Sequence, residues 1–249
     1  MKAARVAGLV AAVLVALGSP GQARAGAPGT VERAEAADVD PFEKKEATEP
    51  AVPPLPDPLE GMNRAFFAFN DKLYFWFLRP VAGAYKSVVP RPARVGVRNV
   101  FSNLGAPARS LNCLLQGDLK GSGTELARFG VNTTVGVLGF GDPGKHWLKL
   151  TIRKEDFGQT LGVWGIGMGS YSNFPILGPS CTRDTVGFVV DVLLDPLTFM
   201  PGVGLVSRVN STSLSLGEYE DFKKSVLDPY VAMRDAYNQH RRHAVASWD

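Results

Sequence analysis

The segment Asp57–Pro80, DPLEGMNRAFFAFNDKLYFWFLRP, places strong helix signals around a composition that few water-soluble helices have. Asp57 can cap the free N–H groups of a first turn, Pro58 suits the first helical position, and Glu60 completes a capping box. Because proline has no N–H and clashes with the preceding turn, the sequence predicts that this helix ends before Pro80. Any fold of this chain must accommodate an unusually aromatic helix.

Bulky apolar side chains cover most of the circumference of this helix. At about 100° per residue, its polar side chains gather into one narrow stripe. The stripe argues against a simple spanning helix, which needs about 20 mostly apolar residues, and the aromatic content does not suit a surface helix. Two structures remain open: a helix in a protein core, or a helix within lipid whose polar stripe faces protein or a water-filled cavity. The stripe consists of Glu60, Asn63, Arg64, Asn70 and Asp71.

The N-terminus has the pattern of a secretory signal peptide over residues 1–25. Lys2 and Arg5 form a charged n-region, Val6–Leu17 forms an apolar h-region, and Ala23-Arg24-Ala25 matches the small-x-small cleavage pattern. The h-region is too short to be interpreted as a membrane span. We therefore predict export across a membrane by a cleaved signal peptide.

Charge and composition separate the next segment from the rest of the chain. The formal net charge is +3, and Lys2, Arg5 and Arg24 account for all of it, because residues 1–25 contain no Asp or Glu. The remaining chain is neutral overall and lacks the basic footprint of a nucleic-acid-binding protein. Residues 26–56 are acidic, rich in small residues and proline, and nearly free of aromatic residues. Such a segment has little surface to bury, so we predict a disordered linker.

Residues 57–249 are predicted to form one mainly α-helical domain with little or no β-structure, beginning with a helical hairpin over 57–89. Glycines recur between 145 and 182 without a clean period, which predicts irregular structure with at most one or two short strands. A polar stretch begins at residues 202–204. Further helical patterns cover residues 93–104, 107–115, 124–135, 186–200 and 225–243. Within 186–200, the Asp195-Pro196 step is predicted to divide the run into two helices or to kink one.

The chain has two cysteines, Cys113 and Cys181, and neither lies near the signal peptide. In an exported protein they could form one disulfide, or they could remain two buried thiols, and the sequence leaves both open. Two cysteines also argue against a thiolate zinc site. No metal site is expected.

A search for catalytic groups gives no candidate. The three histidines are His146, His240 and His243, and no HExxH or GxSxG motif accompanies them. The glycines around Gly165–Gly169 lack the spacing of a nucleotide-binding loop. We therefore expect no catalytic residue and no cofactor.

Several stretches in order resemble one family. They are DPLEGMNRAFFAFND, RPVAGAY, VPRPARVGVRNVFSNLGAPARSLNCLLQGD, RFGVNTTVGVLGFGD, FGQTLGVWGIGMGSYSNFPILGPSCTRD and DPYVAMRDAY. Together they run from about Asp57 to Tyr237, and they are similar to the MlaA (VacJ) family of outer-membrane phospholipid-transport proteins.

The resemblance implies a ring-shaped, almost wholly helical protein in the inner leaflet of the outer membrane. Such a protein is a passive conduit rather than an enzyme. It removes mislocalised phospholipids from the outer leaflet and passes them to a soluble periplasmic lipid carrier, in association with a trimeric porin. Two alternatives are a soluble periplasmic lipid-binding carrier and, less compatible with the histidine count, an exported hydrolase.

The resemblance also implies roles for particular residues. A substitution such as Asn63→Leu is accordingly predicted to alter lipid flow rather than folding. The hairpin that borders the lipid channel would contain Met62, Asn63, Arg64, Phe66, Phe67, Asn70 and Asp71. The membrane-facing residues would be Phe69, Leu73, Trp76 and Phe77. The glycine-rich core motifs would contain Gly139, Phe140, Gly141, Asp142, Gly165, Gly167 and Gly169.

The chain departs from the common family pattern at its signal sequence. Typical members are lipoproteins with a lipobox cysteine, whereas this signal ends in Ala23-Arg24-Ala25-Gly26. We therefore predict that the aromatic helix 57–78 retains the protein in the membrane, because burial of large apolar side chains in lipid is favourable.

Overall fold

The structure, a computed structural model, describes residues 52–195, 200 and 202–246. These residues belong to one compact unit, Pro50–Asp249. The predicted signal peptide and the predicted linker up to residue 51 lie outside the described residues.

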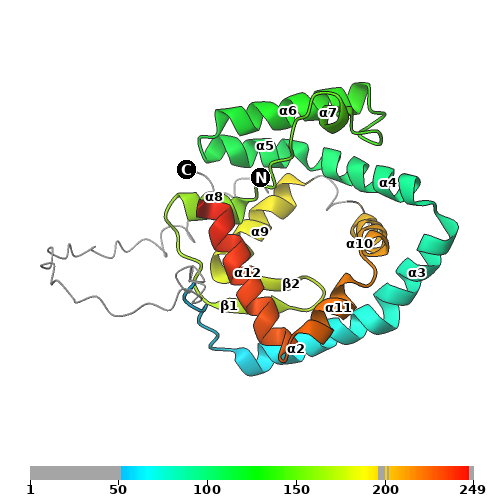
Figure 1. The fold of residues 1–249 in the computed structure, drawn as a ribbon. Helices are drawn as coiled ribbons and strands as arrows, with labels where there is room; N and C mark the ends of the chain where they lie inside the picture. Colours follow the sequence, from blue (N-terminus) through cyan, green and yellow to red (C-terminus); the bar gives the residue numbers. More distant parts are fainter. Residues whose placement is uncertain (1–51, 196–199, 201, 247–249) are drawn as a thin grey trace, which may run out of the picture. The chain divides into compact units, whose positions relative to one another are not determined.

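The described part of the chain is mainly α-helical, as predicted (Figure 1). A single two-stranded sheet interrupts the helices among the described residues. In chain order the elements are α2 (Glu60–Leu73), η1 (Tyr74–Leu78), α3 (Arg79–Val88), α4 (Arg91–Leu104), α5 (Ala106–Leu115), α6 (Leu119–Thr134), α7 (Pro143–His146), α8 (Phe157–Val163), β1 (Tyr171–Phe174), β2 (Gly178–Cys181), α9 (Thr182–Leu194), α10 (Val203–Leu214), α11 (Glu218–Ser225) and α12 (Pro229–Ala246).

Local sequence explains where several helices begin. Asp118 caps α6 by accepting the N–H of Gly121 at 2.7 Å, and Asp156 caps α8 by accepting the N–H of Gln159 at 2.9 Å. Proline occupies the first turn of α4, α5 and α7, where its missing N–H costs no helical hydrogen bond. The helical patterns over 93–104, 107–115, 124–135 and 225–243 are confirmed, and the pattern over 186–200 is confirmed as far as Leu194. Residues 196–199 of that pattern lie outside the described residues. The helices α10 and α11 occupy the stretch after Gly202, for which the sequence predicted only a polar segment.

The predicted end of the first helix at Pro80 is wrong, and so is the hairpin. The turns of α2, η1 and α3 follow one another from Glu60 to Val88 without a break. The π-turn Tyr74–Leu78 explains the difference, because Arg79 donates its N–H to Tyr74 O, five residues back. A widened turn directly before proline relieves the clash and the lost bond that would otherwise end the helix. The chain bends instead at Val89, whose backbone is extended.

Within this unit the elements contact one another around a closed circuit (Figure 1). β1 packs on α2, and α10 lies against both α3 and α4. α4 contacts α5 and α6, α5 contacts α8, and α8 contacts α9 and α12, which both return to β2. The described helices therefore form the ring-like arrangement that the resemblance implied.

β1 and β2 pair antiparallel, with Tyr171 opposite Cys181 and Phe174 opposite Gly178. The short strands that were predicted between 145 and 182 are confirmed. Their connecting turn, Pro175–Leu177, reaches toward α2 and α10 (Figure 1). This β-hairpin is the element around which the site is built.

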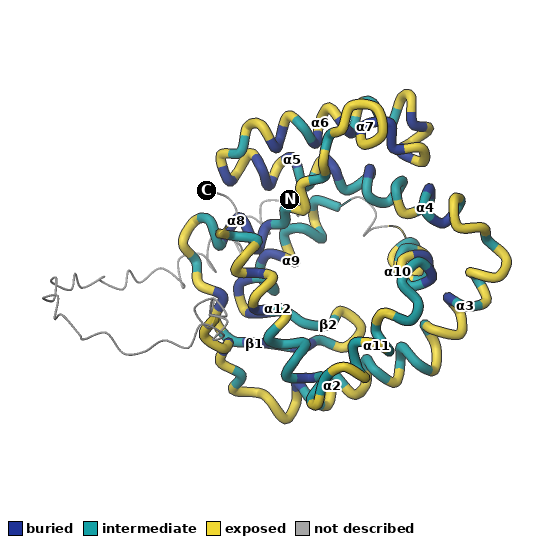
Figure 2. The backbone as a smooth tube through the Cα atoms, in the orientation of Figure 1, coloured by how far each residue is buried: buried dark blue, intermediate teal, exposed yellow. Residues whose placement is uncertain are grey.

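Burial in this unit differs from that of an ordinary water-soluble domain (Figure 2). Among the described residues, 19 polar or charged side chains are buried but only 10 hydrophobic ones, while 29 large hydrophobic side chains are exposed. Many of the buried polar groups have protein partners: fully buried Glu125, for example, accepts from Arg109 Nη2 and from the backbone N–H of Arg153, both at 2.7 Å. Such bonds offset the cost of removing polar groups from water. A polar interior and an apolar exterior suit a protein surrounded by lipid.

The folded unit begins before Asp57, so the predicted linker boundary at residue 56 is too late. Leu55 is 5% exposed and packs with Met168, Tyr171, Cys181 and Tyr230. The backbone oxygens of the neighbouring prolines also accept hydrogen bonds, Pro53 O from Asn238 Nδ2 at 2.9 Å and Pro56 O from Tyr171 N at 2.8 Å. One large apolar side chain and two fixed carbonyls are enough to order this end of the segment.

Of the two states that the sequence left open for the cysteines, the structure has two buried thiols and no disulfide between them. Cys113 and Cys181 are free and fully buried. Cys113 lies on α5, which packs on α6, whereas Cys181 ends β2, which packs on α9 and α12. Burial raises the pKa of Cys113 to about 12 and also raises that of Cys181, so both thiols stay protonated and inert.

Candidate functional site

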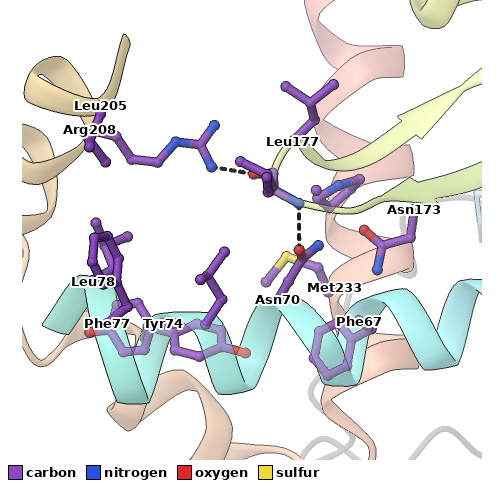
Figure 3. Close-up of a pocket in the computed structure, with 15 residues that line it drawn as sticks. Phe67, Asn70, Tyr74, Phe77, Leu78, Asn173, Leu177, Leu205, Arg208 and Met233 are labelled. Atoms are coloured by element: carbon purple, nitrogen blue, oxygen red, sulfur yellow. Dashed lines mark hydrogen bonds between the residues drawn. The ribbon is translucent and has the colours of Figure 1, made fainter. Parts of the chain in front are cut away.

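A cavity of about 390 Å³ lies between α2, η1, the β-hairpin turn and α10 (Figure 3). We call it the apolar cavity, because most of its wall is aliphatic or aromatic. Side chains at helical spacing on α2 and η1 bring Phe67, Tyr74 and Leu78 to one side of it. Its lining residues are Phe67, Asn70, Leu73, Tyr74, Phe77, Leu78, Asn173, Ile176, Leu177, Gly178, Pro179, Leu205, Arg208, Tyr219 and Met233.

Two polar side chains hold the hairpin turn over this cavity. Asn70 Nδ2 donates to Phe174 O at 2.8 Å, and Asn70 Oδ1 accepts the N–H of Ile176 at 2.7 Å. From the opposite side, Arg208 on α10 donates through Nη1 to Ile176 O (Figure 3). The turn is therefore fixed between α2 and α10, and Ile176 contacts both anchors.

A second cavity of about 470 Å³ shares Leu177, Gly178, Pro179 and Arg208 with the first. We call it the charged cavity. Its wall combines the aromatic rings of Phe174 and Phe188 with ionisable groups from α8, α9, α10 and α12. The ionisable residues of its lining are Asp156, Asp184, Asp191, Arg208, Tyr237 and Arg241.

Arg241 controls the ionisation of two of these carboxylates. Its Nη1 and Nη2 donate to the two oxygens of Asp156 at 2.6 and 2.8 Å, and its Nε lies 2.6 Å from Asp184 Oδ2. Burial alone would raise the pKa of both carboxyls, but the hydrogen bonds and charge of Arg241 outweigh it and hold both pKa values below their usual range. These two aspartates are therefore anionic and compensated.

The pKa of Asp191 is shifted in the opposite direction from those of Asp156 and Asp184. Burial raises its pKa, although Phe157 N–H donates to both carboxylate oxygens and Asn112 Nδ2 donates to Oδ1 at 3.2 Å. No ion pair to Asp191 is present among the described residues. The charged cavity thus contains one carboxylate without a cationic partner.

Of the seven predicted channel residues, Phe67 and Asn70 line the apolar cavity. Asn63 does not: it is 1% exposed, its Nδ2 donates to Asp57 at 2.7 Å, and its Oδ1 accepts the N–H of Asn173 at 2.9 Å. It fixes α2 to β1 rather than lining a channel. The prediction that Asn63 borders a lipid channel stays a prediction, but its side chain lines neither cavity and two of its partners, Tyr171 O and Asn173 N, lie more than a hundred residues away in the sequence.

The other predicted channel residues also lie elsewhere. Arg64 pairs with Glu60 at 2.7 Å and Asp228 at 2.9 Å, and its guanidinium carbon lies 4.5 Å from the ring centroid of Tyr230. Asp71 accepts from Tyr219 at 2.9 Å and Lys223 at 2.7 Å. Met62 is 47% exposed and Phe66 is half-buried, and neither lines the apolar cavity or the charged cavity.

Three of the four predicted membrane-facing residues are exposed, Phe69 at 50%, Trp76 at 77% and Phe77 at 46%. Phe77 also borders the apolar cavity, and half-buried Leu73 lines it. Because Asn70 bonds to the hairpin turn, the apolar side chains that share its face of the helix, such as Phe67 and Leu73, also lie at the cavity.

The glycine-rich motifs build loops outside both cavities. Asp142, with φ 44°, accepts from Arg128 Nη2 at 2.8 Å and Asn132 Nδ2 at 2.9 Å. Gly139, with φ 99°, packs so closely that a Cβ there would lie 2.5 Å from Asn103 Cβ. Gly165 and Gly169 also have positive φ, and Gly167, Phe140 and Gly141 lie in the same two loops. The glycines with positive φ allow the tight backbone turns of these two loops.

Sequence reasoning missed the residues that line both cavities, which are Leu177, Gly178, Pro179 and Arg208. The turn could have been recognised from Pro175 and Gly178 between two short extended segments. Nothing in the local sequence distinguishes Arg208 from other helical arginines, because its role depends on the hairpin opposite it.

A sequence profile of the MlaA lipoprotein family matches residues 55–244. This chain belongs to the MlaA family. It is 37% identical over 190 residues to the intermembrane phospholipid transport system lipoprotein MlaA of Escherichia coli K12, covering 74% of this chain and 76% of that one. The MlaA of Haemophilus influenzae is 31% identical over 199 residues, covering 76% and 79%.

A solved structure from work on the structural basis for maintenance of bacterial outer membrane lipid asymmetry has the same fold. It superposes with a TM-score of 0.68 at 37% identity and covers 76% of this chain and 98% of that chain. The mainly helical MlaA fold predicted from the resemblance is thereby confirmed. Among the described residues, no helix combines the length and apolar character needed to cross a membrane.

Proposed function

We propose that this chain is a passive phospholipid conduit of the outer membrane that maintains lipid asymmetry. It takes mislocalised phospholipids from the outer leaflet and passes them toward the periplasm. Relatives at 37% and 31% identity are named as components of an intermembrane phospholipid transport system. The work on the similar solved structure concerns outer-membrane lipid asymmetry.

The observation that carries the proposal is the pairing of an apolar cavity with a charged cavity around one shared hairpin turn and one shared arginine. A phospholipid has the same two parts, acyl chains and a charged headgroup. Ligand sites combine apolar walls with a few placed polar groups in this way. The two cavities together therefore suit an amphipathic lipid better than a wholly polar solute.

The exterior supports a position within lipid. Large apolar side chains such as Trp76 at 77% and Val88 at 81% exposure would be costly in water over so much of a surface. A soluble carrier would need an exterior that water covers, so the exposed apolar surface favours the conduit over the carrier. We place the ring in the inner leaflet of the outer membrane, with the charged cavity open toward the periplasm.

The proposal also covers export, membrane retention and partners. A signal peptide over residues 1–25 exports the chain, and an acidic linker precedes the folded domain. Relatives are called lipoproteins, but both cysteines of this chain are buried in the fold. We propose that exposed side chains such as Phe69 and Trp76 retain the domain instead. Partners are a trimeric porin and a soluble periplasmic lipid carrier, and no catalytic step is involved.

The test is complementation of a strain that lacks its own MlaA. Leu205→Asp places a carboxylate in the apolar cavity, whereas Val206→Asp changes the next residue of α10, which has a similar exposure of 53% against 51% and lies outside both cavities. We expect wild type and Val206→Asp to lower outer-leaflet phospholipid and restore detergent resistance, and Leu205→Asp to fail although it reaches the membrane. Equal activity of both variants would refute the cavity as the lipid path.

A further inference from the structure

Arg208 stands where the two cavities meet. It lines both of them, and its Nη1 donates to Ile176 O at the hairpin turn. It forms no ion pair among the described residues. A guanidinium carries five N–H donors in a planar fork that matches phosphate oxygens, so most of its donors remain for an anion.

Asp191 lies on the wall of the charged cavity, on α9. Unlike Asp156 and Asp184, which share Arg241, it has only uncharged donors, the N–H of Phe157 and Asn112 Nδ2. A positive charge that binds beside a partly buried, unpaired carboxylate stabilises the ionised form of that carboxylate. In the described part of the chain, the same cavity thus offers one arginine without an ion pair, Arg208, and one carboxylate without a cationic partner, Asp191.

We propose that the charged cavity binds the headgroup of a zwitterionic, ammonium-bearing phospholipid, with Arg208 contacting the phosphate and Asp191 receiving the ammonium. This inference rests on the proposed function and adds selectivity to it. The acyl chains occupy the apolar cavity, which Arg208 also lines. An anionic lipid whose headgroup ends in glycerol satisfies Arg208 but leaves Asp191 facing a neutral group. Phosphatidylethanolamine is therefore preferred over phosphatidylglycerol.

Two variants separate the two contacts. Arg208→Gln removes the charge that meets the phosphate common to both lipids, so binding of both falls by about tenfold, as expected for loss of a charge-assisted hydrogen bond. Arg208→Lys keeps the charge and restores part of the binding. Asp191→Asn has nearly the same shape and keeps the oxygen that accepts from Phe157. It lowers the preference for phosphatidylethanolamine and leaves phosphatidylglycerol binding unchanged.

The experiment uses the purified full chain in detergent, stripped of lipid. It is incubated with mixed micelles of phosphatidylethanolamine and phosphatidylglycerol at equal amounts and with the same acyl chains, and the bound lipids are quantified by mass spectrometry. The matched controls are Arg98→Gln, an exposed arginine on α4, and Asp221→Asn, an exposed aspartate on α11. Both controls should keep the wild-type amount and ratio.

A lipid-side probe keeps the test independent of folding. N-acetylated phosphatidylethanolamine retains the phosphate but has no ammonium, so wild-type protein should bind it as weakly as phosphatidylglycerol. Equal binding of all three lipids by wild type, or an unchanged ratio in Asp191→Asn, would overturn the headgroup assignment while the conduit stands. If wild type bound no phospholipid at all, the proposed function itself would fail.

Discussion

Asn63 offers the sharpest test of how this fold is held together. The resemblance led us to expect that a substitution there alters lipid flow, but the structure assigns it to the joint between α2 and β1. Its side chain donates to Asp57 at 2.7 Å and to Tyr171 O at 3.3 Å, and accepts from Asn173 N at 2.9 Å. Replacing it with alanine removes all three bonds and leaves Asn173 N–H without that acceptor in a buried place.

The magnitude follows from these contacts. A buried donor left without a partner costs about 1–3 kcal/mol, and the charge-assisted bond to Asp57 contributes about 1.5–3 kcal/mol more. We therefore expect Asn63→Ala to lower the free energy of unfolding by about 3 kcal/mol. For a domain of this size such a loss corresponds to about 6–12 °C in Tm.

The assay is thermal unfolding of the full chain in detergent, followed by the helical circular dichroism signal. Asn99→Ala is the matched control, because Asn99 also lies on a helix but makes one exposed bond to Phe140 O at 3.3 Å. Its Tm should stay within about 2 °C of wild type. An unchanged Tm for Asn63→Ala together with lost lipid transport would refute the structural role and restore the channel assignment.

Three further predictions follow from other parts of the structure. Gly139→Ala forces φ 99° on an alanine and brings its Cβ against Asn103, so the free energy of unfolding should fall by about 2 kcal/mol. The control Gly123→Ala, whose Cβ would meet no atom within 4 Å, should be neutral or stabilising. Equal changes in stability for the two variants would contradict this. Because Asp156 and Asp184 have lowered pKa values when folded, their stabilisation is present above the unfolded pKa of about 3.9 and is lost as pH falls through the folded values. Arg241→Met should therefore flatten the fall in stability that urea unfolding measures below about pH 4, and an unaltered pH profile would speak against the pairing. Trp76→Asp should increase release by carbonate washing without changing Tm, while Leu227→Asp, fully exposed near α12, should not; identical release would remove the retention role of α2 and η1.

The buried polar contacts explain why these effects are expected to be large. In most soluble domains the interior is apolar, and a lost polar contact at the surface is replaced by water. Here the interior carries groups such as Glu125, Arg128 and Asp142, whose partners are protein atoms. Truncating one side of such a pair leaves the other uncompensated in a place that water does not easily reach.

The sequence by itself determined the helical class, most helix positions and the family. These depend on local signals: apolar periodicity, the caps at Asp118 and Asp156, and proline in first turns. Such signals act within a few residues, so they can be recognised without knowing what packs against them.

Only the tertiary structure decided what each polar residue of the aromatic stretch Asp57–Pro80 does. Asn63 and Asn70 are the same residue type on one face of α2, yet Asn63 joins β1 while Asn70 holds the hairpin turn over the apolar cavity. The continuation of the helix through Pro80 likewise depended on the π-turn before it. Arg208 had no sequence signal, because its position between two cavities is created by a hairpin that lies opposite it in space. Hydrogen-bond partners and cavity walls come from segments far apart in the chain, and their proximity exists only after folding.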